Sequence, residues 1–548
     1  MVLNGCGGGG QAYSDGGATT TTSTPTSGSS GATSGTGNAI AGASLTTSWG
    51  VVNQPSLPTS VCASLTATLT PINGSIDSVD ESPSNSQPDT LRIQNAINTC
   101  PAGQAIRLSK GAAGQVGFLS APLKLNSGVT LWIDQGVTLF ASRNPADYDN
   151  GPGTCGTAIP TDLRSCNPFI LADSTNGSGI VGDGAIDGRG GSLLTTGPNA
   201  KYRSWWDVAY QNKSDTLSQQ NPMIIRVNNS SNFTLYRVAV MNSPNFHIST
   251  SNVAGVTAWG IKILSPSAVY TKPRYACPAN STPDKITPAT CFTPDTVKNT
   301  DGFDPGQSSK VLLAYSYISV GDDNVAVKSH TTSPSTNLAF LHNHFYYGHG
   351  MSIGSETDSG LNNMLVNDLT IDGNDSSVSI GLRIKSDSSR GGLVTDVTYS
   401  QICMRNVRQP LVFDSFYRDV NAGTKYPAFT NITIRDFHNL GSAKYAGGTM
   451  TFAGYNANAQ KNPIGITLDN VVFDGKQPGF DAGHNGGPSV LPAATHFTFG
   501  PGQVSFASSI ISSSINDVTV SGSSGSSTPL DCSAAFVPFN SVLADSPI

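Results

Sequence analysis

Four short polar motifs between residues 299 and 385 indicate how this chain folds: Asn299-Thr300-Asp301, Gly321-Asp322-Asp323, Gly348-His349-Gly350 and Arg383-Ile384-Lys385. Asp301 and Asp322 are 21 residues apart, Asp322 and His349 are 27 apart, and His349 and Arg383 are 34 apart. If one turn of a coiled β-structure takes about that many residues, the motifs stack on one face of successive turns. Three carboxylates, one imidazole and two cations then meet in one groove, a set suited to acid–base chemistry on an anionic substrate.

Short runs of β-branched and apolar residues recur around these motifs. The run at 233–238 is followed 23 residues later by the run at 256–261, and the run at 311–315 is followed 27 residues later by that at 338–342. Such a period, with two or three short strands in each unit, predicts a solenoid. Leucine-rich repeats would need Leu and Asn at fixed offsets, which are absent, so we expect an all-β parallel β-helix whose turns rise about 4.8 Å.

The composition agrees with a strand-rich protein. Of the 548 residues, 37% are hydrophobic and only 12% are charged, with 59 Gly and 33 Pro, so the chain lacks the residues that long helices need. The net charge of −6 provides no global basic field for nucleic acid, and any anion binding must therefore be local. No run of 18 apolar residues occurs, so no membrane span is expected.

The chain divides into a leader, residues 1–50, and one β-helix domain, residues 51–548. The leader is rich in Ser, Thr and Gly, which predicts a disordered tether. Its Leu3-Asn4-Gly5-Cys6 run resembles the end of a bacterial lipoprotein signal, although the apolar region of such a signal is missing. Cys6 is therefore either a lipid anchor that holds the protein at a bacterial cell surface or a stray cysteine in a disordered leader.

Within the domain, apolar residues at helical spacing after Asp89 predict a short helix that closes the end of the stack. Insertions at 143–168, 196–222 and 265–298 should project and wall a groove. Apart from Cys6, eight cysteines can form four disulfides in 105 ways. The close pairs Cys155/Cys166 and Cys277/Cys291 lie in irregular segments that stapling would stabilise, which favours an oxidising, extracellular compartment.

Each motif also has a common structural interpretation. The adjacent acids Asp322 and Asp323 repel each other, so their pKa values should separate into an acid and a base, but Gly-Asp-Asp-Asn is also good turn sequence. Asp301 lies in an equally turn-like run. A lone histidine such as His349 is more often structural, and Arg383-Ile384-Lys385 reads equally as a solvated strand face. Their order, spacing and complementary charges together favour a functional site.

At these residues the chain resembles glycoside hydrolase family 28, the polygalacturonases, which carry the same four motifs in this order. The longer runs at 242–247, 322–328, 348–357 and 381–387 are similar to bacterial endo-acting members. The resemblance covers about residues 60–540 and implies a right-handed parallel β-helix. It also implies hydrolysis, with inversion, of α-1,4 bonds between galacturonic acid units of de-esterified cell-wall pectin, by a secreted monomer without metal or cofactor. Carboxylates one turn apart should lie about 5 Å apart, a separation typical of enzymes that retain the anomeric configuration. We nevertheless expect inversion, because the family inverts.

The resemblance implies a role for each site residue. Asp322 is the general acid, and Asp301 and Asp323 hold and activate the water. His349 tunes the protonation of the acid. The remaining residues contact the substrate or support the site: Arg383 and Lys385 at the galacturonate carboxylate, Tyr417 at the cleaved sugar, and, as weaker candidates, Asn299, His247 and Lys328.

Several alternatives remain open at the level of sequence. An exo-acting polygalacturonase would differ only in loops that block the groove, and the motif runs favour endo action. A rhamnogalacturonan hydrolase would depart from Asn-Thr-Asp and Arg-Ile-Lys. A pectate lyase would need clustered acids for Ca²⁺ and an arginine base. A non-catalytic β-helix polysaccharide-binding protein would explain the solenoid and tether but not the four intact motifs.

Overall fold

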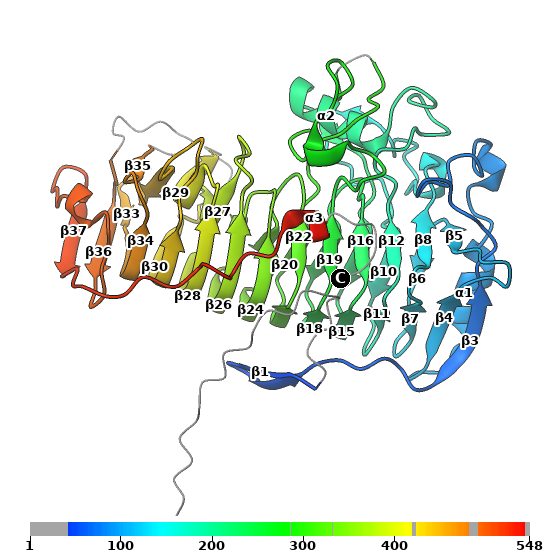
Figure 1. Ribbon diagram of the computed structural model, residues 1–548, viewed down its shortest axis with the longest axis horizontal. Helices are drawn as coiled ribbons and strands as arrows, with labels where there is room; N and C mark the ends of the chain where they lie inside the picture. Colours follow the sequence, from blue (N-terminus) through cyan, green and yellow to red (C-terminus); the bar gives the residue numbers. More distant parts are fainter. Residues whose placement is uncertain (1–41, 285–286, 331, 419–423, 482–490, 543–548) are drawn as a thin grey trace, which may run out of the picture. The chain divides into compact units, whose positions relative to one another are not determined.

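The computed structural model describes residues 42–542, except 285–286, 331, 419–423 and 482–490. Their strands stack as parallel coils of a right-handed β-helix, as Figure 1 shows from β3 at one end to β37 at the other. The predicted fold class is therefore confirmed. The Cys6 prediction and most of the leader lie outside the described residues, and a hairpin of β1 (Ser44–Thr47) and β2 (Gly50–Asn53) spans the expected boundary at residue 50.

One parallel sheet has eleven strands and carries the motifs. In spatial order its strands are β6 (Leu123–Lys124), β10 (Ile170–Asp173), β14 (Ile225–Asn228), β17 (Ile248–Ser251), β20 (Phe303–Gly306), β23 (Val325–Ser329), β25 (Met351–Thr357), β27 (Ile380–Asp387), β29 (Gln409–Arg418), β31 (Thr449–Ala453) and β35 (Gly479–Phe480).

A twenty-stranded sheet forms the other faces. Its strands are β3 (Val61–Thr66), β4 (Ala105–Ser109), β5 (Gly117–Ser120), β7 (Thr130–Ile133), β8 (Thr138–Ala141), β11 (Gly179–Val181), β12 (Ala185–Asp187), β15 (Ser231–Tyr236), β16 (Ala239–Met241), β18 (Ala254–Trp259), β19 (Lys262–Leu264), β21 (Ser309–Ala314), β22 (Tyr317–Ser319), β24 (Ser335–Phe345), β26 (Leu361–Asp372), β28 (Leu393–Arg405), β30 (Ala428–Asn439), β34 (Ile464–Phe473), β36 (Thr495–Phe499) and β37 (Val518–Gly522). Early coils use two short strands here, whereas β24 pairs with both β21 and β22 and begins a series of single long strands.

The core runs along the inside of the coil. Phe233, Val256, Val311, Leu338 and Met364 occupy matching register positions in successive strands, and all are buried. Each coil places its apolar residue on the one below, so the core is one continuous column. This stacking explains the recurring apolar runs in the sequence.

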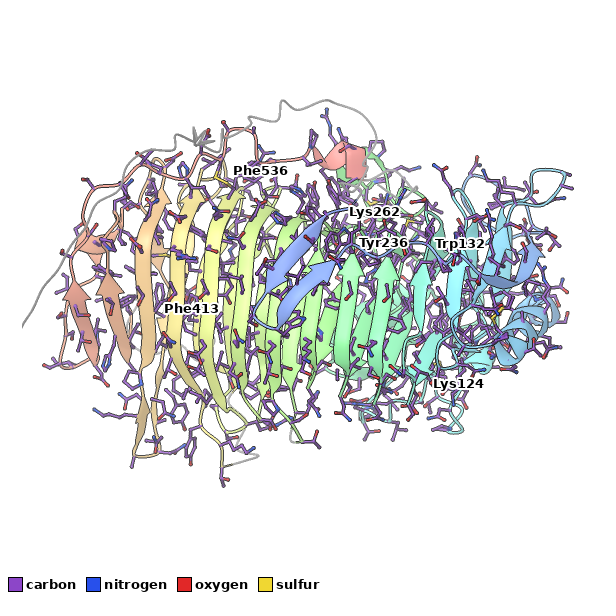
Figure 2. The ribbon with its side chains drawn as sticks, turned by 90° about the horizontal axis from the view of Figure 1, so that it is seen from below. Lys124, Trp132, Tyr236, Lys262, Phe413 and Phe536 are labelled. Carbon is purple, nitrogen blue, oxygen red and sulfur yellow. A yellow bond between two sulfur atoms is a disulfide. The ribbon has the colours of Figure 1, made fainter. Side chains whose placement is uncertain are left out.

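Helix α1 (Thr90–Thr99) closes the N-terminal end of this column, as expected. Its residues Ile93 and Ile97 are fully buried against the first coils. All eight predicted cysteines pair, as Cys62–Cys100, Cys155–Cys166, Cys277–Cys291 and Cys403–Cys532. The β1–β2 hairpin packs on an outer face that includes Tyr236 and Trp132, and Figure 2 shows it lying across the strands near Tyr236.

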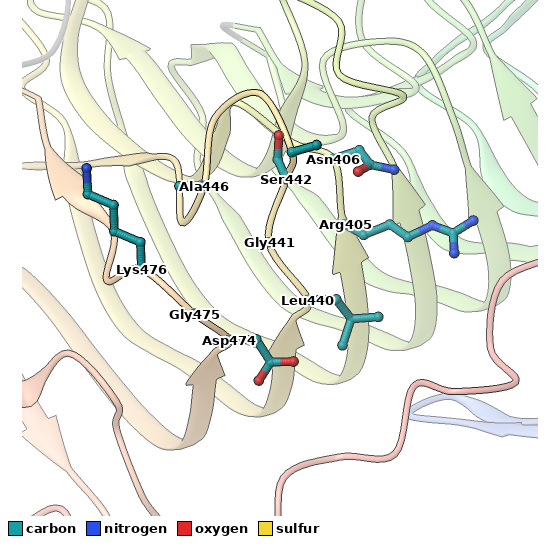
Figure 3. A pocket seen from close by; sticks show the side chains of 10 residues that line it. Arg405, Asn406, Leu440, Gly441, Ser442, Ala446, Asp474, Gly475 and Lys476 are labelled. Carbon is teal, nitrogen blue, oxygen red and sulfur yellow. The ribbon is translucent and has the colours of Figure 1, made fainter.

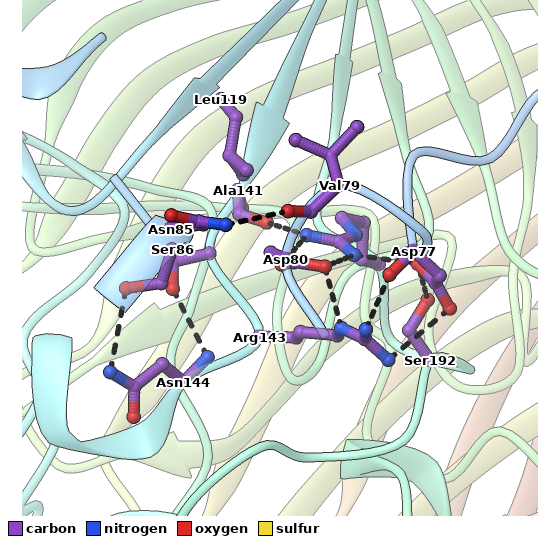
Figure 4. A network of polar contacts seen from close by, with 12 residues as sticks. Asp77, Val79, Asp80, Asn85, Ser86, Leu119, Ala141, Arg143, Asn144 and Ser192 are labelled. Atoms are coloured by element: carbon purple, nitrogen blue, oxygen red, sulfur yellow. Dashed lines mark hydrogen bonds and ion pairs between the residues drawn. The ribbon is translucent and has the colours of Figure 1, made fainter. Parts of the chain in front are cut away.

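A buried ion network fastens the segment before α1 to the coil (Figure 4). Arg189 donates to both oxygens of Asp80 and to Asp77, and Arg143 donates to Asp80 over 2.9 Å. Burial raises the pKa of Asp77, but Arg189 and Arg143 outweigh it and hold that pKa below its usual value. Two acids thus meet two guanidinium groups, and the network is balanced.

None of the helices in the described residues has the length and apolar character that crossing a membrane needs. Helix α2 (Trp205–Asp215) instead belongs to the second insertion and begins with a capping box between Ser204 and Asp207. The last helix, α3 (Phe539–Val542), ends the described chain.

Candidate active site

Consecutive strands of the eleven-stranded sheet bring the four motifs together. The register pairs Phe303 with Val325, Val325 with Met351, and Met351 with Leu382. Because Asp301, Asp323 and His349 each lie two residues before a paired position, they occupy equivalent places on successive coils. The stacking predicted from their spacing is therefore confirmed.

Asp323 is the buried centre of the site. Its Oδ2 accepts a hydrogen bond from Lys385 Nζ over 2.9 Å, and its Oδ1 accepts from Arg383 Nη2 and from Ser352 Oγ. Its side chain is 1% exposed. Burial raises the pKa of Asp323, but the charges of Arg383 and Lys385 outweigh it and lower that pKa, so the carboxylate stays ionised.

Asp322 lies at the surface of the cluster and contacts His349. His349 Nδ1 is 3.0 Å from Asp322 Oδ1, and the His349 N–H donates to the Asp322 carbonyl over 2.8 Å. The Asp322 side chain is 17% exposed, compared with 5% for Asp301 and 1% for Asp323. Burial raises the pKa of Asp322, but the charges of His349 and then Lys385 hold it below its usual range in the free site.

The pKa values of Asp301 and Asp304, in contrast to that of Asp322, are raised. Burial and the charges of Asp322 and Asp304 raise the pKa of Asp301 well above its ordinary value. Burial raises the pKa of Asp304 to about 7, although Lys328 Nζ lies 3.3 Å from its Oδ2. Asp301 Oδ1 is buried, and no hydrogen bond from the described residues reaches it.

Of the weaker candidates, one supports Asp301 from within the core and two line a cleft. His247 is fully buried and contacts the Asp301 carbonyl through both its N–H, over 2.8 Å, and its Nδ1, over 3.0 Å. Burial lowers the pKa of His247 to about 4, so it is a neutral support beneath Asp301. Asn299 and Lys328 line the cleft, and Lys328 Nζ lies 3.9 Å from Asp301 and 4.0 Å from Glu356.

A cleft of about 580 Å³ extends from these residues. The first two predicted insertions line it, with residues such as Arg164 and Lys213, while Arg226 lines its floor. The third insertion, 265–298, contributes no lining residue to this cleft among those described, but the charge of its Lys298 interacts with Asp322. The same insertion contacts the turn before His349, where Tyr275 and Tyr347 have ring centroids 4.9 Å apart.

A smaller cavity of about 180 Å³ opens on the other side of Arg383 and is lined also by Gln409 and Tyr417. Lys385 Nζ lies 4.8 Å above the Tyr417 ring, so the predicted tyrosine does join the cations. A third hollow, around Arg405, Ser442 and Lys476, contains no motif residue (Figure 3). Motif residues therefore line the first two cavities and not the third: Asn299 lines the cleft and Arg383 the smaller cavity.

Asp322, Asp323 and His349 place their ligand-type atoms within 4.8 Å of one another, as a metal site would. Arg383 and Lys385 already supply positive charge at Asp323. The absence of a metal stays a prediction. The arrangement of acids and cations suits proton transfer next to an anionic ligand.

Comparison with known proteins places this arrangement in a family. The model of "Glycosyl hydrolases family 28" matches residues 104–482. The chain belongs to glycosyl hydrolases family 28. This family 28 chain is 64% identical to a polygalacturonase of Ralstonia solanacearum over 510 residues, covering 92% of the chain and 96% of that protein.

Two further comparisons agree with this family assignment. The family 28 chain is 42% identical to an endo-polygalacturonase of Pectobacterium carotovorum subsp. carotovorum over 383 residues, which is 70% of the chain and 83% of that protein. It also resembles the solved polygalacturonase of Erwinia carotovora ssp. carotovora, with a TM-score of 0.62 and 33% identity, covering 87% of the chain and 97% of that structure. The chain is accordingly a glycoside hydrolase, as predicted.

Some residues of this family 28 site were not assigned from the sequence. Asp304 was not assigned and is buried beside Lys328. Ser352 donates to Asp323 and accepts from Arg383, and Asn324 holds the Tyr347 carbonyl and the Gly350 N–H. All three follow a motif by a few residues, but only the coil stacking reveals their partners.

Proposed function

We propose that this hydrolase cleaves α-1,4-galacturonosidic bonds of polygalacturonate, the de-esterified form of pectin, at internal positions. The observation that carries the proposal is the cleft lined by Asn299, Asp304 and Lys328 beside the acid cluster, where Lys328 Nζ lies 3.9 Å from Asp301. Further cations, among them Arg164, Lys213 and Arg226, line the same cleft. Galacturonate units are anionic, and cations on a pocket wall bind carboxylates through charge-assisted hydrogen bonds. The named polygalacturonases among its relatives support the same substrate.

Asp322 donates the proton to the leaving glycosidic oxygen in this proposal. It is the most exposed of the three carboxyl groups, so a sugar oxygen in the cleft reaches it first. In the free site His349 and Lys385 keep the pKa of Asp322 low. A bound galacturonate carboxylate offsets those positive charges, so substrate raises the pKa of Asp322 and loads the acid as the complex forms.

Asp301 and Asp323 hold the attacking water. The Oδ1 atom of Asp301 is buried and carries no protein hydrogen bond among the described residues, so a water admitted beside it would supply the missing hydrogen bond. Asp323 stays ionised through Arg383 and Lys385 and is a fixed negative charge that orients the water and supports the developing positive charge on the sugar. Asp301 in its ionised form takes the proton of the attacking water, and its raised pKa makes it the stronger base of the two carboxylates.

Arg383 and Lys385 bind the carboxylate of the sugar at the cleavage site. Both are bound to Asp323, but Arg383 also borders the smaller cavity with Tyr417, and Lys385 lies over the Tyr417 ring. A galacturonate in that cavity thus meets the cations and an aromatic face. Methyl esterification removes the anionic charge, so esterified units are poor ligands there.

The test is a reducing-sugar assay on de-esterified polygalacturonate with viscosity followed in parallel. Release of reducing ends with an early fall in viscosity supports endo action, whereas release with little viscosity loss indicates an exo enzyme. Binding without reducing ends would support the polysaccharide-binding alternative. NMR of the first-formed anomer tests inversion, because a product that keeps the substrate configuration contradicts it.

We also propose that the protein works outside the cell as a monomer, without cofactor. The four disulfides support an oxidising compartment. Lipid attachment at Cys6 and a flexible tether stay predictions, because residues 1–41 lie outside the described residues. Residues 44–50 at the end of the predicted tether belong instead to the packed β1–β2 hairpin. Mass spectrometry of the mature N-terminus tests both the attachment and the site of any cleavage.

A further inference from the structure

The end of the chain runs back along the coil rather than away from it. After β37, residues 524–542, here called the return strap, cross earlier coils towards the motif region, as the red segment in Figure 1 shows. Ser527 Oγ donates to Asn470 Oδ1 over 2.7 Å, and His438 Nδ1 lies 2.7 Å from the Leu530 carbonyl. The strap thus passes over β34 and then β30.

Further along, the return strap is fixed covalently and then by aromatic contacts. Cys532 is disulfide-bonded to Cys403 of β28. Beyond it, the Arg405 guanidinium lies 4.2 Å from the Phe536 ring centroid, and Tyr346 Oη donates to the Val537 carbonyl over 3.0 Å. These contacts lead the strap to the base of the turn that carries His349.

Helix α3 ends the strap beneath that turn. The Phe539 ring has its centroid 5.0 Å from Tyr346, 5.5 Å from Tyr347 and 6.1 Å from Tyr275. Lys262 Nζ donates to the Val542 carbonyl over 3.1 Å, and Val542 is 1% exposed. One phenyl ring therefore packs between the turn before His349 and the third insertion.

The turn itself depends on close packing. The Tyr347 carbonyl accepts hydrogen bonds from Val320 N–H over 3.0 Å and from Asn324 Nδ2 over 2.9 Å. Gly348 adopts φ +138° against the Asn324 side chain, and a Cβ there would come within 2.5 Å of Asn324 Oδ1. Any shift of Tyr347 is therefore transmitted through Gly348 to His349 and to Asp322.

We propose that Phe539 is a positioning residue for hydrolysis: packed against Tyr346 and Tyr347, it holds the His349 turn in the geometry that His349 needs beside Asp322. The inference rests on the proposed function, because it concerns the same site. It explains why a tail from the last coil is fastened across the molecule to the coil that bears His349. A shift of about 1 Å in a catalytic group can cost up to 10²-fold in rate.

The experiment compares Phe539→Ala with Phe536→Ala on de-esterified polygalacturonate. Both phenylalanines are half-buried on the same strap, but Phe536 packs on Arg405 rather than on the His349 turn. We expect Phe539→Ala to lower kcat about tenfold with KM changed less than twofold, and Phe536→Ala to leave both unchanged. Phe539→Tyr, which keeps the ring, should restore at least half of the wild-type kcat.

Near-UV circular dichroism measures the folded fraction of each variant and normalises kcat to folded enzyme, so a loss of stability alone cannot imitate the effect. An unchanged kcat in Phe539→Ala, equal losses in both alanine variants, or no rescue by Phe539→Tyr would overturn the proposal. Wild-type turnover in the same assay reports separately on the proposed function, since its absence would contradict polygalacturonate hydrolysis whatever the variants do.

Discussion

The two buried ion clusters of this molecule use the same residue types with opposite results. Near α1, Asp77 and Asp80 meet Arg143 and Arg189, so two negative charges face two positive ones. At the motif site, the ion pairs among the described residues join five acids, Asp301, Asp304, Asp322, Asp323 and Glu356, to Lys328, Arg383, Lys385 and His349. Lys213 and Lys298 add Coulomb interactions with Asp322, and His330 adds one with Glu356. The first cluster is balanced and the second has excess acid.

This difference in balance explains what each cluster does. In the balanced network the Asp77 pKa is lowered and the groups stay paired, so the network acts as a staple. In the acidic cluster the carboxyls cannot all ionise together, and the pKa of Asp301 rises while that of Asp322 falls. Separated pKa values in one cleft are the condition for an acid and a base to work together.

The largest expected effect comes from Asp322→Asn, which keeps the shape of the side chain but removes the proton donor. We expect kcat to fall about 10²- to 10⁴-fold, because that is the usual contribution of a general acid. Thermal unfolding should change little, and Asp368→Asn on the outer sheet, which is 53% exposed, is the control. A variant that keeps more than about a tenth of the wild-type rate would contradict the assignment.

Arg189→Met tests the balanced network. It leaves Asp80 buried with one guanidinium, and we expect the free energy of unfolding to fall by about 3–5 kcal/mol. Urea unfolding measures this loss, while kcat per folded molecule should remain that of the wild type. Arg189→Lys keeps the positive charge but not the several N–H donors of the guanidinium, so it should lower the free energy of unfolding less than Arg189→Met does. If Arg189→Met changed kcat but not stability, the contrast between the two clusters would be wrong.

Asp304→Asn tests the excess of acid through pH. Burial raises the pKa of Asp304 from 3.8 to about 7. Between these values the unfolded chain releases a proton that the folded protein keeps, so this carboxyl lowers the free energy of unfolding as pH rises and adds no further change above about 7. As pH rises from 4 to 8, the free energy of unfolding of the asparagine variant should therefore rise by roughly 1–3 kcal/mol relative to that of the wild type.

Unfolding in urea at several pH values measures that difference, with Asp162→Asn at an exposed carboxyl as the matched control. A difference between Asp304→Asn and wild type that does not vary with pH would show that Asp304 is ionised like a surface acid. The excess of acid would then be smaller than the structure indicates.

The smallest expected effect concerns an exposed ion pair between an arginine and an aspartate, the residue types of the buried network. Arg107 Nε lies 2.9 Å from Asp134, but the Arg107 side chain is 43% exposed. We expect Arg107→Gln to cost only about 0.5 kcal/mol in the free energy of unfolding and to leave kcat unchanged, because water screens such pairs. A loss as large as that of Arg189→Met would show that burial is not what distinguishes the networks.

The sequence by itself determined the coil and the main chemistry. Period and strand pattern predicted a parallel β-helix, because each turn must bury its apolar residue on the next, as Val311 does on Leu338. Motif spacing near one turn predicted that Asp301, Asp322 and His349 meet. Asp89 and the residues after it likewise predicted α1, because local spacing sets a short amphipathic helix.

Only the tertiary structure decided which charges are partners and what supports them. The pairing of Arg383 with Asp323, the burial of Asp304 beside Lys328 and the contact of Phe539 with Tyr347 join residues on different coils. The two close disulfides were indicated by local spacing, but the Cys403–Cys532 disulfide, which joins residues 129 apart, could not be read from the sequence. Such contacts depend on the three-dimensional path of the chain, and neither residue type nor local spacing encodes it.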